Sequence, residues 1–198
     1  MLIRRKGLVL AGATLAAGLA AALEGRLPRG VSAVLYELAV PPAAAPTPDK
    51  VALGDKLFND KRLSINDQVS CATCHDPARG FVDHKPLPDG VAAPAQRPQR
   101  NSPTVLNAMF NATQFWDGRA PSLEEQAKLP ILNPIEMGQK SPDEVVAKVR
   151  ALPEYREAFP RVFGHEATYD DIAAASPAAS VAPPSTRPFR RISMDPPP

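Results

Sequence analysis

The segment Cys71-Ala72-Thr73-Cys74-His75 constrains this sequence more than any other. Two cysteines three apart, followed at once by histidine, form the attachment pattern of a c-type haem. Cys71 and Cys74 are the only cysteines in the sequence, so no second pair completes a four-ligand zinc site. A thioredoxin-like redox pair would need a βαβ pattern, which does not flank this segment. We therefore predict one covalent haem c on the two thiols, with His75 as an axial ligand of the iron.

Composition restricts the fold classes and the kinds of partner that the chain is expected to have. The 23 Lys and Arg residues nearly balance the 21 Asp and Glu residues, which argues against a dedicated nucleic-acid binder. An aromatic content of 6% and 24 prolines are typical of helices joined by long irregular segments rather than of a dense sheet. We expect one all-α domain with long loops, in which the haem supplies part of the apolar core.

The two ends of the chain differ in character from its middle. Residues 1–23 combine a basic start with a long apolar run and small residues, which is the pattern of an export signal. This segment is either a cleaved signal peptide or an uncleaved N-terminal anchor, and only the second would attach the protein to a membrane. Both place the body outside the cytoplasm, in a bacterial periplasm. Residues 24–47 form a Pro/Ala-rich spacer, and residues 176–198 are predicted to be disordered.

Between these ends, apolar spacing and capping residues predict a series of helices. The expected elements are a helix from Pro48 to Asn59 or Asp60, a long loop over 76–100, a short helix over 105–110, a helix that begins at Pro121 and stops before Pro130, a helix capped by Ser141, a helix over 154–163 that Pro160 kinks or ends early, and a last helix from Tyr169 capped by Thr168.

Several short motifs, taken together and in order, resemble the bacterial di-haem cytochrome c peroxidases and their relative MauG. The matching pieces are Leu53-Gly54-x-x-Leu57-Phe58, Cys71-Ala72-Thr73-Cys74-His75, Arg100-Asn101-Ser102-Pro103-Thr104, Phe115-Trp116-Asp117-Gly118-Arg119, Leu123-Glu124-Glu125-Gln126-Ala127 and Pro134-Ile135-Glu136-Met137. The match covers residues 48–175, and it corresponds to the N-terminal haem domain alone.

The resemblance implies a cytochrome c-like helical fold and a periplasmic peroxidase. In that family the N-terminal haem reduces hydrogen peroxide, and a second haem domain receives electrons from a small cytochrome c or copper protein. The present sequence has one C-x-x-C-H motif, so we expect a truncated chain that carries the first haem domain only.

The same resemblance implies roles for four further residues. Glu136 would be the acid/base that moves a proton between the two oxygens of peroxide, Gln126 would position peroxide or water, and Trp116 would relay electrons between the haems. Asn101 would contribute to a calcium site, although calcium needs roughly six to eight oxygen ligands and the family's other ligands lie largely in the missing half. Without the resemblance, Glu136 and Gln126 would be ordinary surface residues, and Trp116 a core anchor.

Other residues around the haem stay open at this stage. Arg100 and Arg119 are candidates for the haem propionates or for ordinary surface salt bridges. His84, in the loop after the haem motif, is expected to be exposed, which leaves the sixth position of the iron open or water-bound. His165 is expected at the surface. Met109 and Met137 are the methionines available as ligands, and we expect packing for Met109 and attachment to the Glu136 loop for Met137.

The predicted function is therefore a c-type haem peroxidase domain. The alternative is a mono-haem electron-transfer cytochrome c without peroxidase activity. A third reading is a fragment that binds haem without function.

Overall fold

The computed structural model of the chain describes residues 46–177. The predicted export segment at 1–23, the spacer up to residue 45 and the tail from residue 178 lie outside the described residues. The described part includes the whole of the predicted haem domain, 48–175.

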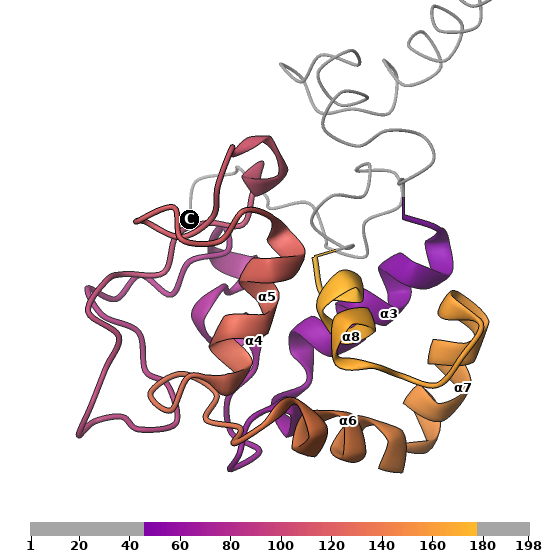
Figure 1. Cartoon of the computed structure of the whole chain (residues 1–198). Helices are drawn as coiled ribbons and strands as arrows, with labels where there is room; N and C mark the ends of the chain where they lie inside the picture. Colours follow the sequence, from indigo (N-terminus) through magenta and orange to yellow (C-terminus); the bar gives the residue numbers. More distant parts are fainter. Residues whose placement is uncertain (1–45, 178–198) are drawn as a thin grey trace, which may run out of the picture. The chain divides into compact units, whose positions relative to one another are not determined.

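Residues 46–177 are built from helices and loops (Figure 1). In chain order the elements are α3 (Pro48–Asn59), η2 (Lys61–Leu63), α4 (Cys71–Cys74), η3 (Pro77–Arg79), η4 (Ala108–Phe110), α5 (Leu123–Leu132), α6 (Pro142–Ala151), α7 (Pro153–Phe163) and α8 (Tyr169–Ala175). Within these residues there is no strand, only an isolated bridge between Gln114 and Ala120. The all-α prediction is confirmed. None of the helices in this part of the chain combines the length and the apolar character needed to cross a membrane.

The first helix, α3, ends where the sequence predicts. The Thr47 hydroxyl accepts a hydrogen bond from the Lys50 amide, and Pro48 occupies the first turn, where its missing N–H costs nothing. Its apolar face is buried, with Leu57 fully inaccessible to solvent. This helix packs against α4, α7 and α8, so it connects the haem motif to the helical core.

The helix α5 corrects one prediction, because it continues through Pro130 to Leu132. A proline in a helix removes one i→i−4 hydrogen bond, which usually ends or kinks it. Here the chain after the helix folds back and compensates. The amide of Met137 donates to the Pro130 carbonyl at 3.2 Å, and the amide of Gln139 donates to the Ile131 carbonyl at 3.0 Å. The Ile131 side chain is also buried in the core, which stabilises the last turn.

The helices α6 and α8 begin at the predicted caps, Ser141 and Thr168. The hydroxyls of Ser141 and Thr168 accept hydrogen bonds from the amides three residues on, at the starts of α6 and α8. The helix α7 does not end early at Pro160; it runs to Phe163 and closes with Gly164 in the left-handed region, whose amide donates to the Pro160 carbonyl. Capping is local, which is why the sequence predicts it well.

The helix predicted over 105–110 is only partly present. The structure has a single 3-10 turn at Ala108–Phe110, and the side chains of Leu106 and Phe110 are exposed rather than packed on a common face. The Asn107 backbone, with φ of 62°, breaks the helical path just before the turn.

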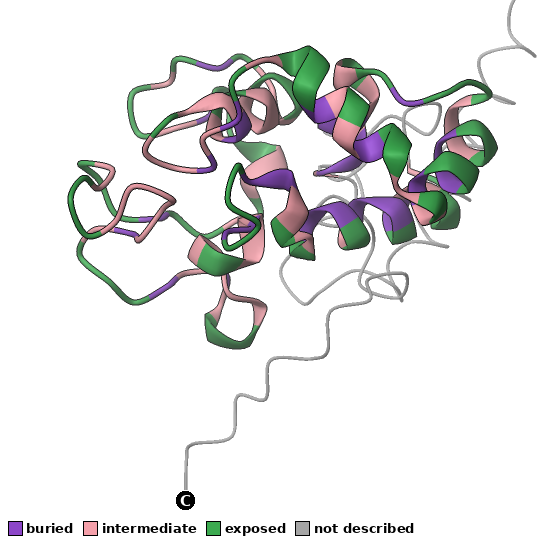
Figure 2. Ribbon diagram, turned by 90° about the horizontal axis from the view of Figure 1, so that it is seen from below, coloured by how far each residue is buried: buried purple, intermediate pink, exposed green. Residues whose placement is uncertain are grey.

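Burial is uneven along the chain. The main core cluster draws on the stretch from Leu53 to Val69 and on the stretch from Ile131 to Ala175, and no fully buried residue of the segment 70–130 belongs to it. In Figure 2 the buried ribbon is concentrated in the helices, whereas the loops are mostly intermediate or exposed. The loops between α4 and α5 lie on one side of the described unit, and α7 lies on the other (Figure 1).

Candidate functional site

The haem motif occupies one helical turn, α4. Residues three apart on a helix lie on the same face, so the thiols of Cys71 and Cys74 face one side together. The Thr73 hydroxyl accepts a hydrogen bond from the Ser70 amide at 2.9 Å and fixes the start of the turn. Both cysteines are free thiols rather than a disulfide, as thioether formation requires.

Both thiols lie in surroundings that keep them protonated. Burial raises the pKa of Cys71 to about 11. Burial also raises the pKa of Cys74 to about 12, and the negative charges of Asp83 and Glu136 add to the shift. Cys74 therefore lies within electrostatic range of the predicted acid/base residue.

His75 follows the turn directly, and its ring meets the backbone carbonyls of Phe81 and Pro103. Its amide donates to the Cys71 carbonyl at 2.9 Å, and its Nδ1 lies 3.4 Å from the carbonyl oxygen of Phe81. With the proton on Nδ1, the lone pair of Nε2 is available to a metal ion. Burial lowers the pKa of His75, against the opposing effect of the Phe81 and Pro103 carbonyls and Asp83, so the ring is neutral at pH 7.

Phe81 presents this carbonyl from an unusual backbone conformation. Its φ is 63°, in the left-handed region that residues with a bulky side chain seldom adopt. Its amide donates to the Asp76 carbonyl at 2.8 Å, and its ring packs edge-on against Phe58 of α3 at 6.1 Å. The partner of the His75 ring is thus held by both a turn and the first helix.

The segment between α4 and α5 fits a large apolar group. It is long, it adds no fully buried residue to the main core cluster, and it leaves Leu106, Phe110 and Trp116 exposed. Loops normally need either a core or a ligand to hold them in place. A haem attached to Cys71 and Cys74, with His75 on the iron, would supply the missing apolar surface.

Glu136 lies on a tight loop whose backbone is fixed from three directions. Its amide donates to the Asn133 carbonyl at 3.0 Å, and its carbonyl accepts from the Val91 amide at 2.8 Å. A side chain on Gly90 would come within 2.0 Å of the Ile135 carbonyl oxygen, so only glycine permits this approach. Next along the chain, Met137 is buried in the core.

The Glu136 carboxyl is half-buried and electrostatically perturbed. Burial raises its pKa above the ordinary glutamate value, while the positive charge of Arg119 and a hydrogen bond from Asn133 partly lower it again. The Asn133 amide nitrogen donates to Oε1 at 2.8 Å. A half-buried carboxyl with a raised pKa beside a haem attachment site has the properties of a general acid/base.

Gln126 is half-buried on α5, and its side-chain amide makes no hydrogen bond to any residue in 46–177. A helix repeats every 3.6 residues, so Gln126, Pro130 and Asn133 share one face, and this face leads to the Glu136 loop. Its amide group therefore remains available to a small ligand.

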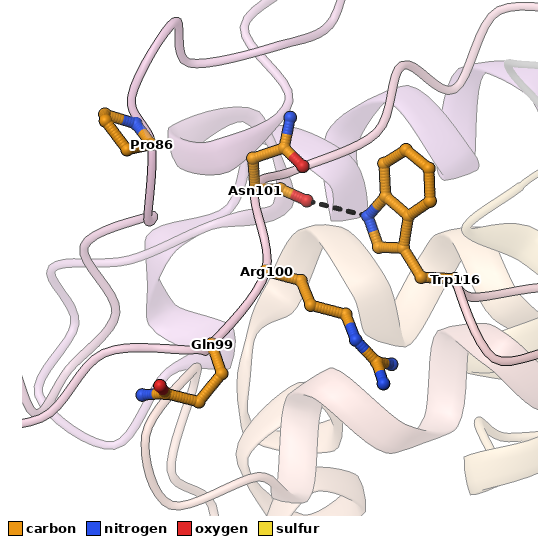
Figure 3. A pocket seen from close by; sticks show the side chains of 5 residues that line it. All are labelled: Pro86, Gln99, Arg100, Asn101 and Trp116. Atoms are coloured by element: carbon orange, nitrogen blue, oxygen red, sulfur yellow. Dashed lines mark hydrogen bonds between the residues drawn. The ribbon is translucent and has the colours of Figure 1, made fainter.

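Trp116 and Asn101 are joined to each other by a hydrogen bond. The indole N–H of Trp116 donates to the Asn101 carbonyl at 3.0 Å, and the two residues line a shallow pocket of about 470 Å³ with Pro86, Gln99 and Arg100 (Figure 3). Trp116 is 61% exposed, so it is not a core anchor. The described residues hold no cluster of three or more His, Cys, Asp or Glu side chains suited to a metal ion, and the calcium role of Asn101 stays a prediction.

Arg100 and Arg119 both form ion pairs with Asp117, at 2.7 Å and 2.8 Å. The guanidinium of Arg119 also stacks on the Phe115 ring, with 3.5 Å between its carbon and the ring centroid. All three charged side chains are exposed, and the surface salt bridges considered for the two arginines are present.

The other candidate histidines are exposed, and the candidate methionines are buried or half-buried. His84 is exposed and its Nε2 lies 3.2 Å from the Arg79 carbonyl oxygen, and His165 is exposed near Asp171. Met137 is 3% exposed within the core cluster, so it is committed to packing. Met109 is half-buried in a 3-10 turn.

Three residues of this site were not predicted from the sequence, namely Phe81, Asn133 and Gly90. Phe81 had no local signal. Asn133 and Gly90 each had a local signal, since Asn133-Pro134 and Asp89-Gly90 are dipeptides that mark turns. Neither dipeptide indicates that the two turns meet at Glu136.

Comparisons with known proteins relate the chain to one family. The family model described as di-haem cytochrome c peroxidase matches residues 48–178. The chain is 47% identical to cytochrome c551 peroxidase of Pseudomonas aeruginosa over 126 residues, which is 62% of this chain and 36% of that protein. It is also 47% identical to the methylamine utilization protein MauG of Methylorubrum extorquens, over 63% of this chain and 35% of that protein.

Solved structures of the same kind share the fold. A MauG-like protein associated with microbial copper homeostasis superposes with a TM-score of 0.64 and 32% identity, over 71% of this chain and 42% of that one. The di-haem peroxidase BthA from Burkholderia thailandensis gives a TM-score of 0.63 and 29% identity, over 76% of this chain and 43% of that one. The chain thus spans well under half of the length of these relatives.

Proposed function

Because this chain belongs to the family of di-haem cytochrome c peroxidases, we propose that it forms a haem peroxidase domain that reduces hydrogen peroxide to water. One haem c would be held by Cys71 and Cys74, with His75 on the iron. When bound, the haem would supply an iron that binds peroxide and exchanges electrons with it. A small cytochrome c or copper protein would donate the electrons, and the reaction would take place in the periplasm.

The observation that carries this proposal is the placement of Glu136. It combines half-burial, a fixed backbone and electrostatic coupling to Cys74 of the haem motif. Reduction of one peroxide to two waters consumes two electrons and two protons, and cleavage of the O–O bond needs a proton moved from one oxygen to the other. A carboxylate that takes the proton from one oxygen and returns it to the other contributes about 10²–10⁴-fold to the rate.

Neighbouring side chains support this role. No residue of 46–177 hydrogen-bonds to the side-chain amide of Gln126, which lies on the helix face that leads to Glu136, so Gln126 would hold peroxide or water by hydrogen bonding. Arg119 lowers the pKa of Glu136, which favours the carboxylate that must accept the first proton. Trp116, exposed at the surface, would relay electrons from the second haem domain that the relatives possess to the haem of this domain.

The substitution Glu136→Gln tests the proposal. It keeps the size of the side chain and removes the proton acceptor, so we expect peroxide turnover to fall by at least about 10²-fold. The haem content, measured as the pyridine haemochrome, should not change. Glu124→Gln, an exposed glutamate in the first turn of α5, is the matched control and should keep full turnover. Unaltered turnover in Glu136→Gln would remove this residue from the mechanism.

The absorption spectrum separates the proposal from the mono-haem electron carrier. A carrier with methionine on the iron would be low-spin, with a relatively high potential. The burial of Met137 in the core argues against that residue as the ligand. We expect instead a spectrum that changes readily on addition of cyanide.

A further inference from the structure

Asn133 connects the end of α5 to the Glu136 loop with every polar group it has. Its side-chain Nδ2 donates to Glu136 Oε1 at 2.8 Å, and its side-chain Oδ1 accepts from the Ile135 amide at 3.2 Å. Its backbone carbonyl accepts from the amides of Glu136 and Gly138, at 3.0 and 2.9 Å. Its own amide caps α5 by donating to Leu129 and Pro130. This residue therefore determines both the path of the loop and the orientation of the carboxyl.

The two carboxylate oxygens of Glu136 are not equivalent as a result. Oε1 accepts the hydrogen bond from Asn133, whereas Oε2 has no hydrogen bond to any residue that the structure describes. An amide donor carries no titratable proton, so it can hold a carboxylate without competing for the proton that the carboxylate exchanges. The arrangement leaves one oxygen fixed and the other available.

Three groups on neighbouring elements act on Glu136. Arg119, from the loop before α5, and Asn133, at the end of α5, both favour the charged form. Cys74 of α4 lies within electrostatic range, and as a haem thioether it would carry no charge. Of these groups, Asn133 is the one with a direct hydrogen bond to the carboxyl.

We propose that Asn133 is a positioning residue for Glu136, which holds Oε1 so that Oε2 is the oxygen that exchanges protons with peroxide. This inference rests on the proposed function of Glu136 as the acid/base. It predicts that loss of the Asn133 donor changes the pKa and the orientation of the Glu136 carboxyl while haem attachment is unchanged.

The test is an infrared pH titration of the Glu136 carboxyl in the haem-loaded protein, with the band assigned by its loss in Glu136→Gln. Asn133→Ala removes both side-chain hydrogen bonds. Asn133→Asp retains the Oδ1 acceptor for the Ile135 amide, loses the donor and adds a second carboxyl beside the first. A hydrogen bond to a charged group is worth about one to two pH units, so we expect the protonated band to persist to higher pH by about that amount in both variants.

Turnover gives a second readout. The acidic limb of the pH profile should move in the same direction as the infrared band, with a lower kcat and a nearly unchanged KM for peroxide. Asn66→Ala is the matched control, because the Asn66 side chain accepts from the Gln68 amide in a similar turn at another place in the chain. Haem content and thermal unfolding establish that each variant is folded, and Asn133→Asp serves if Asn133→Ala does not fold.

The outcomes separate the two proposals. If Glu136→Gln abolishes turnover but both Asn133 variants leave the infrared band in place, the role of Asn133 is wrong and that of Glu136 stands. An equal shift in Asn66→Ala would also overturn the inference. If turnover survives Glu136→Gln, the proposed function is wrong, and Asn133 has no catalytic group to position.

Discussion

At the scale of single residues, the Glu136 carboxyl that the proposed reaction needs also lowers the stability of the fold at neutral pH. Burial raises the pKa of its carboxyl, so the folded protein holds this proton up to a higher pH than the unfolded chain does. The stabilisation from the protonated form is therefore complete at low pH, below the unfolded value, and is lost as the pH rises through the folded pKa. At pH 7, above the unfolded value, the raised pKa of this group therefore reduces the stability of the fold.

Glu136→Gln should consequently stabilise the protein at pH 7 while it removes activity. The glutamine is neutral and can still accept the hydrogen bond from Asn133, so we expect the thermal midpoint to rise by a few degrees. At a pH well below the ordinary pKa of glutamate, residue 136 is neutral in both the parent protein and the variant, so the difference between their thermal midpoints should vanish. Thermal unfolding followed by circular dichroism at the two pH values checks this. A lower midpoint than the parent protein at pH 7 would contradict it.

The sequence predicts these residues to very different degrees. Cys71, Cys74 and His75 follow from their spacing alone, because the chemistry of haem attachment requires adjacent residues. Glu136 enters only through the resemblance to a family, since a glutamate between isoleucine and methionine has no local signature. Asn133 acts through its side-chain amide on Glu136, and Phe81 acts through its backbone carbonyl on His75. Only the folded structure shows where these two groups point.

At the scale of elements, the sequence predicts the helix caps, but it does not predict how a proline inside a helix affects the length of that helix. Ser141 and Thr168 bond to amides three residues away, so their role is readable from a few letters. The persistence of α5 through Pro130 depends on amides of the following loop, and that of α7 through Pro160 on the Gly164 cap. Tertiary contacts of this kind override the local preference.

The contact between Gly90 and the Glu136 loop predicts the effect of a substitution at Gly90. Gly90→Ala should destabilise the protein by about 1–3 kcal/mol, because the new methyl group overlaps the Ile135 carbonyl. It should also displace Glu136, and a displacement of about 1 Å typically costs about 10²-fold in rate. Urea unfolding and peroxide turnover measure the two effects.

Gly164→Ala is the control for this substitution. Gly164 has a φ of 80° and no atom near its absent side chain, so alanine there introduces backbone strain but no overlap. We expect a loss of about 1 kcal/mol in stability with normal turnover. Equal loss of turnover in the two variants would show that the overlap at Gly90 has no special effect on Glu136.

At the scale of the whole described unit, one part has its own core and the other does not. The helices α3 and α6 to α8 pack on each other around Leu57, Val145, Phe159 and Ile172, all fully buried. The loops between α4 and α5 have no comparable cluster. The sequence predicts the long loop over 76–100 but does not show that this loop lacks a core cluster of its own.

This division predicts the behaviour of the protein without haem. In the double variant Cys71→Ser, Cys74→Ser, the backbone amides of α3, α7 and α8 should remain protected from hydrogen exchange. Those of residues 76–122 should exchange with an opening free energy near zero. In the haem-loaded protein the same loop amides should be slowed strongly. Hydrogen–deuterium exchange read by mass spectrometry checks the pattern, and equal loop protection in both forms would contradict it.

If the haem orders the loops between α4 and α5 in this way, cofactor loading would control how easily proteases degrade the chain. Proteases cleave backbone that opens readily, and they spare backbone that is held closed. A polypeptide that misses the attachment step would present the whole 76–122 segment to degradation, whereas a loaded one would conceal it. The thioether linkage would then distinguish mature protein from immature protein, because chains without haem would be degraded before they accumulate.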